Sequence, residues 1–149
     1  MMKRRGIMIA GVLAAVLGLT GCASPNPDPV KSALSSASGI QSAKVVVNHP
    51  GAPWNTQTLV TVRVSDGSVA TSEAAARTVA QTLAGTPVAE HDVYVYFDYD
   101  APEGATAPPM HVGVDTLRQV AGELGLDAGA ARESLHMRPA DIRRLATKE

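Results

Sequence analysis

The chain has 149 residues, with thirteen basic and fourteen acidic side chains and a formal net charge of −1 at pH 7. Its single cysteine excludes an internal disulfide and a zinc site built from several thiolates. The absence of a basic excess excludes binding of nucleic acid by bulk electrostatic attraction, so we expect no nucleic-acid partner.

The beginning of the chain carries three features in a fixed order. Residues 3–5 form a basic head, and residues 7–19 form an uncharged apolar run. A membrane-spanning helix needs about 20 apolar residues, so this run is too short to span the bilayer as a permanent transmembrane anchor. The sequence Leu-Thr-Gly-Cys follows at residues 19–22 and contains the only cysteine of the chain.

This arrangement resembles the signal peptide and lipobox of bacterial lipoproteins. The resemblance implies cleavage between Gly21 and Cys22, a diacylglycerol thioether on Cys22 and, usually, acylation of the new amino terminus by a fatty acid such as palmitate. An ordinary secretory signal followed by an incidental cysteine is the alternative. Loss of three basic side chains with the signal peptide, residues 1–21, would change the net charge from −1 to −4. We therefore expect a protein on the extracytoplasmic face of the cell membrane, with the bilayer as its partner through the lipid on Cys22.

A proline-rich segment follows the lipobox. Residues 22–29 contain three prolines at alternate positions, a pattern that favours an extended path. We therefore predict a semi-rigid tether that lifts the domain off the bilayer. Residues 30–149 are then expected to fold as one domain.

Hydrophobic periodicity predicts the elements of this domain. In chain order they are a short helix at 30–38, strands at 43–49 and 58–65 joined by a long loop, a helix capped by Thr71 or Ser72 and ended by Gly85, a strand at 93–99, a loop at 101–111, a helix at 114–124, a candidate fourth strand at 134–138, and a helix from Pro139 through Leu145. This order predicts an α+β fold, in which helices pack on one face of a small antiparallel or mixed sheet.

The aromatic residues suggest a binding surface. Four of the five lie on the third predicted strand. Alternation places Phe97 in the core and sends Tyr94 and Tyr96 to the opposite face, beside Arg63 if the second and third strands pair. Such a face could bind a protein partner, or a terminal segment could cover it. For Trp54, in the loop between the first two strands, two interpretations remain: a residue that contacts a partner, or a side chain that covers the edge of the sheet.

Residues that could carry catalysis or hold a metal form no convincing pattern. Four histidines lie at predicted strand ends or loop edges without shared spacing: His49, His91, His111 and His136. Asp98, Asp100 and Glu103 resemble part of a calcium loop, but the glycine and the distal glutamate of that loop are missing. Because no Gly-x-Ser-x-Gly motif occurs either, we predict no catalytic residue, no metal and no cofactor.

These observations favour a membrane-anchored lipoprotein of the cell envelope that acts as a non-enzymatic binding or accessory module. Its expected partner, besides the bilayer, is another envelope protein. A small envelope enzyme, or a lipoprotein that binds a ligand or a metal, is the alternative.

Overall fold

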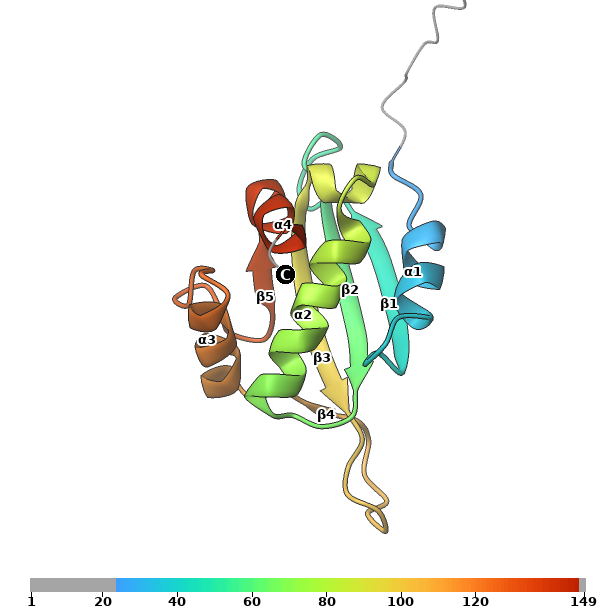
Figure 1. The fold of residues 1–149 in the computed structure, drawn as a ribbon. Helices are drawn as coiled ribbons and strands as arrows, with labels where there is room; N and C mark the ends of the chain where they lie inside the picture. The colour runs from blue at the N-terminus through green and yellow to red at the C-terminus, as the bar shows by residue number, and fades with distance from the viewer. Residues whose placement is uncertain (1–23, 148–149) are drawn as a thin grey trace, which may run out of the picture.

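The computed structural model describes residues 24–147, so Gly21 and Cys22 of the predicted cleavage site lie outside the described residues. In chain order its elements are α1 (Asp28–Ser35), β1 (Ser42–Asn48), β2 (Gln57–Val64), α2 (Val69–Leu83), η1 (Pro87–Glu90), β3 (Asp92–Tyr99), β4 (Met110–His111), α3 (Val114–Glu123), β5 (Leu135–Met137) and α4 (Pro139–Ala146). They form a five-stranded mixed sheet with the helices on one face (Figure 1), which confirms the predicted α+β class.

The sheet has the strand order β1-β2-β3, and both β4 and β5 lie beside the other edge of β3. β1 and β2 are antiparallel neighbours, whereas β2 and β3 are parallel because α2 carries the chain back over the sheet. β4 and β5 are antiparallel to two successive parts of β3. Tyr94 faces His136 of β5, and Asp98 faces His111 of β4.

The core lies between the sheet and the helices. Its strand side is built by alternate buried residues of β2 and β3: Val60, Val62, Val64, Val93, Val95 and Phe97. On the helix side, α2 contributes the small side chains Ala75, Ala76 and Ala80, which let its backbone approach the sheet closely. α2 also contacts the three other helices, so it is the central helix of the covering layer.

The amino-terminal helix begins earlier than the sequence predicted. α1 starts at Asp28, so the prediction of an extended tether over residues 22–29 is wrong for its last two residues. Pro29 suits the first turn of α1, because a backbone N–H at that position would have no partner within the helix. The carboxylate of Asp28 complements the positive end of the helix dipole. Val30 and Leu34, four residues apart, are buried and anchor α1 to the domain.

The cap of α2 also differs from the prediction. Ser68, rather than Thr71 or Ser72, is the N-cap residue, and its Oγ accepts a hydrogen bond of 3.3 Å from the backbone N–H of Thr71. Ser72 is buried inside the helix instead. Hydrogen bonds from Ser68, Ser65 and Thr71 stabilise the carboxylate of Asp66 and lower its pKa to about 2. The turn before α2 is therefore held together by side-chain hydrogen bonds.

The carboxy-terminal half contains one strand that the sequence did not predict and one that it left uncertain. The predicted loop at 101–111 ends in the two-residue strand β4, which is too short for a readable alternation. The segment 134–138 does contain a strand, β5, whose Leu135 and Met137 are buried in the core. Both strands form by pairing with β3, which is distant in the sequence.

Among the glycines of residues 24–147, Gly67 is the one at which an added Cβ atom would come closer than 3.0 Å to another residue. A Cβ atom added there would lie 2.6 Å from Cε1 of Tyr99 and 2.8 Å from its Cζ. Gly67→Ala is therefore expected to displace the ring and lower the free energy of unfolding by about 1–3 kcal/mol, as measured by urea denaturation. In a Tyr99→Ala background the same change should cost little, and an equal cost in both backgrounds would contradict this contact.

Candidate functional site

The face of the sheet opposite the helices is defined here as the open face. The strand register arranges its side chains in three rows: Val46, Leu59, Tyr94 and His136; Lys44, Thr61 and Tyr96; and Ser42, Arg63, Asp98 and His111. Along β3, buried core residues alternate with half-buried residues of this face. Within residues 24–147 no helix lies over it, as Figure 1 shows. The structure thus places Tyr94 and Tyr96 where alternation predicted them, on the face opposite Phe97.

Tyr94 is fixed by a contact that the sequence did not reveal. Its ring stacks on the imidazole of His136, with the ring centroids 4.8 Å apart and the planes inclined by 12°. Nε2 of His136 lies 3.3 Å from Oδ2 of Asp92, close enough for an ion pair when the ring is protonated, but without the geometry of a hydrogen bond. β5 therefore borders the open face at Tyr94 and supports that ring from one side.

A hollow of about 580 Å³ opens beside Tyr96, between β3, β4, the start of α3 and the segment before β5. Its apolar wall includes Tyr96, Val112 and Val114, and its polar wall includes His111, Arg132 and Glu133. Arg132 and Glu133 are exposed at the rim. The hollow thus combines an apolar floor next to the open face with charged groups at the solvent side, which suits an inserted side chain.

The charged residues at the third row of the open face are engaged in pairs. Nη1 of Arg63 lies 3.1 Å from Oδ1 of Asp100, and Nδ1 of His111 lies 2.6 Å from Oδ1 of Asp98. Because Arg63 and Asp100 are both substantially exposed, their pair contributes little to stability, and Arg63 can exchange this partner for another at low cost. The pairing of β2 with β3 places Arg63 on the same face as the two tyrosines, as the sequence predicted for this pairing.

The structure does not assemble the calcium loop that Asp98, Asp100 and Glu103 resemble. Asp98 lies against His111 and Asp100 against Arg63, so the first two carboxylates have separate partners, and Glu103 is exposed in the loop that follows. In the described part of the chain, no group of three or more histidine, cysteine, aspartate or glutamate side chains could hold a metal ion.

Trp54 does not belong to the open face. It lies in the loop between β1 and β2 and is 87% exposed, so it does not plug the edge of the sheet. It lines a separate hollow of about 250 Å³ together with Ser24, Pro25 and His49. The predicted binding residues are therefore divided between two regions: Tyr94, Tyr96 and Arg63 on the sheet, and Trp54 at its end.

His111 and His136 are among the residues of this site that the sequence did not reveal. Alternation of Leu135, His136 and Met137 is the signal that sends the imidazole away from the core. The sequence did not reveal that β5 pairs with β3, because many residues separate the two strands along the chain.

No protein-family model, curated protein or solved structure matches this chain. Among residues 24–147, no helix has the length and apolar character needed to cross a bilayer. The open face and the hollow beside Tyr96 form the candidate functional site.

Proposed function

We propose that this protein is a lipoprotein of the bacterial cell envelope that is anchored through Cys22 and binds an envelope protein with its open face. The anchor is supported by the basic head, the short apolar run and the Leu-Thr-Gly-Cys sequence at residues 19–22. The binding role rests on one observation: the helices cover a single face of the sheet, and Tyr94 and Tyr96 stand on the other.

The chemistry of the open face suits a protein partner. Its middle carries Leu59, Tyr94 and Tyr96, which offer apolar area and two phenolic hydroxyl groups. Tyrosines are enriched among the residues that dominate protein interfaces, because a large rigid ring loses little conformational entropy on binding. Arg63 is paired with Asp100, and Asp98 lies in the same row of the face, so the face lacks the positive field that a nucleic acid would require.

The hollow next to Tyr96 gives this face a place for an anchoring side chain. A partner residue that enters it would contact Tyr96 and the valines of its wall, while the charged rim remains in water. Interfaces draw most of their binding free energy from a few side chains buried in this way. The open face and the hollow would then act as one contact surface.

A photo-crosslinking amino acid in place of Thr61 tests this proposal, because Thr61 lies beside Tyr96 at the centre of the open face. The lipidated chain in its own envelope should form an adduct with one defined protein. The same amino acid at Gln119, exposed on α3, is the matched control and should not trap that protein.

Replacement of both Tyr94 and Tyr96 by serine should leave the chain folded and weaken this capture. Truncation of one strong interface residue lowers the binding free energy by about 2 kcal/mol, so loss of the pair should lower the affinity for the partner at least tenfold. Circular dichroism checks the fold, and the yield of the Thr61 adduct checks binding. Unfolding would show that the rings are core residues, and an unchanged adduct yield would show that the face is idle.

A further inference from the structure

The loop that carries Trp54 is joined to the start of the described chain. Oγ of Ser24 lies 2.7 Å from Nε2 of His49, and Nδ1 of the same ring lies 3.1 Å from Oγ1 of Thr56, on the other side of the loop. His49 therefore bridges the first described residue and the loop. Pro25 and Trp54 line one hollow beside this bridge, so the indole and the start of the chain are close neighbours.

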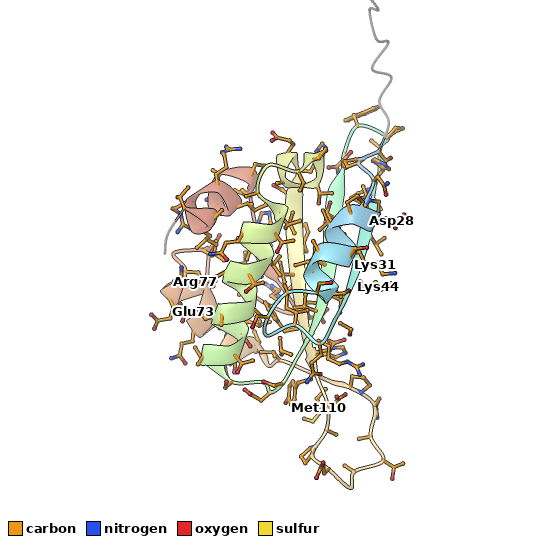
Figure 2. All side chains as sticks on the ribbon, turned by 45° about the vertical axis from the view of Figure 1, so that its right-hand side comes forward. Asp28, Lys31, Lys44, Glu73, Arg77 and Met110 are labelled. Atoms are coloured by element: carbon orange, nitrogen blue, oxygen red, sulfur yellow. The ribbon has the colours of Figure 1, made fainter. Side chains whose placement is uncertain are left out.

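This end of the molecule is opposite to the long loop at residues 101–109. In Figure 1 the β1–β2 loop and the start of α1 lie at one end of the sheet, and the 101–109 loop projects from the other. Figure 2 shows the same separation, with Asp28 at the end where the chain enters the domain and Met110 at the opposite end.

The covalent chain limits how far this end can stand from a lipid on Cys22. Two residue steps separate Cys22 from Ser24, and such a segment spans at most about 7 Å whatever its path. The headgroup region on each side of a bilayer is about 5–8 Å thick. Ser24 is hydrogen-bonded to His49, and Pro25 lines the hollow beside Trp54, so these residues lie against the domain and are not extended away from it. A diacylglycerol thioether on Cys22 would therefore bring Ser24 and its neighbour His49 to the outer boundary of the headgroups.

We propose that Trp54 docks in the headgroup region of the same bilayer and fixes the orientation of the domain on the membrane. This inference rests on the proposed lipid anchor at Cys22. Tryptophan is the side chain most typical of this region, because its ring is apolar and its indole N–H finds polar partners there. The indole is 87% exposed and is the only one in the chain. In this orientation the 101–109 loop points away from the membrane and the open face is accessible from the side.

The charges near the loop favour docking by the ring rather than by electrostatic attraction. Residues 50–57 contain no charged side chain. Asp28 and Lys31 at the beginning of α1 carry opposite charges (Figure 2), and Glu90 directly precedes His91 of the Trp54 hollow. Anionic lipid would therefore not strengthen the contact. Docking is expected on zwitterionic phosphatidylcholine, with little dependence on salt.

The single tryptophan makes the experiment direct. The lipidated chain is purified and reconstituted in phosphatidylcholine vesicles with and without brominated acyl chains near the headgroups. Trp54 emission should shift to shorter wavelength and lose at least half of its intensity with the brominated lipid, at both low and high salt. The matched control moves the tryptophan to the far loop, with Trp54→Phe and Thr106→Trp, and its emission should be unaffected by bromine.

Three results would overturn the inference. An emission of Trp54 that is typical of water and is not quenched would place the loop away from the bilayer. Equal quenching at positions 54 and 106 would show that the domain has no fixed orientation. Mass spectrometry of the same preparation separates the two proposals: an unmodified Cys22 removes the anchor and the docking together, whereas a lipidated Cys22 with unquenched Trp54 removes the docking alone.

Discussion

Cys22→Ala is expected to abolish lipidation completely and leave a precursor that keeps residues 1–21. No other residue of the chain can form the thioether, because Cys22 is the only cysteine. Mass spectrometry of the amino terminus, with detergent phase partitioning of the product, measures both the missing lipid and the retained signal peptide. The shifted variant Cys22→Ala with Ser24→Cys is the matched control: it restores a thiol at the wrong distance from the apolar run and should not restore processing.

An unmodified Cys22 in the parent protein, or a mature chain that starts at another residue, would contradict the lipoprotein assignment. The alternative of an ordinary secretory signal would then hold. The open face would remain a candidate binding surface, because its geometry does not depend on the anchor.

Replacement of Phe97 by alanine is expected to lower the free energy of unfolding by about 3–5 kcal/mol. Its ring is 2% exposed and fills the space between the sheet and the helices. Natural domains have a total stability of about 5–15 kcal/mol, so this loss would unfold a substantial part of the population in a marginal case. Urea denaturation followed by circular dichroism measures it.

Tyr96→Ala is the control for that prediction, because Tyr96 directly precedes Phe97 in the same strand but faces the other side. Its half-buried ring lies on the open face, where a substitution is expected to cost about 1 kcal/mol. A cost for Tyr96→Ala as large as that for Phe97→Ala would mean that both faces of β3 are core faces. That result would contradict the proposed binding role of the open face.

The same alternation separates the residues of β3 that hold the fold from those of the proposed binding surface. Residues of β3 that point toward α2 hold the fold, and their immediate neighbours are free to contact a partner. Substitutions on one face can therefore change binding while the fold persists. The paired experiments on Phe97 and Tyr96 measure this separation directly.

The central part of the fold was predictable from the sequence because its signals are local. Alternation over 58–65 and 93–99 assigned Val60 and Phe97 to the core and Tyr96 to the other face, since side chains in a strand point in opposite directions at successive residues. The alanine-rich stripe of α2 needed no more than helical periodicity. The Leu-Thr-Gly-Cys sequence that resembles a lipobox is also a contiguous pattern, so its interpretation, which stays a prediction, depends on no tertiary contact.

The remaining features depend on contacts between separate segments of the chain. The hydrophobic periodicity of one segment does not reveal which other segment it will contact. β4 and β5 exist because they pair with β3, and the stacking of His136 on Tyr94 follows from that pairing. Only the tertiary structure brought Ser24 beside His49 and thereby placed Trp54 close to Ser24 and Pro25, the first residues that the structure describes. The sequence determined the two faces of the sheet, and the tertiary structure decided which segments border them.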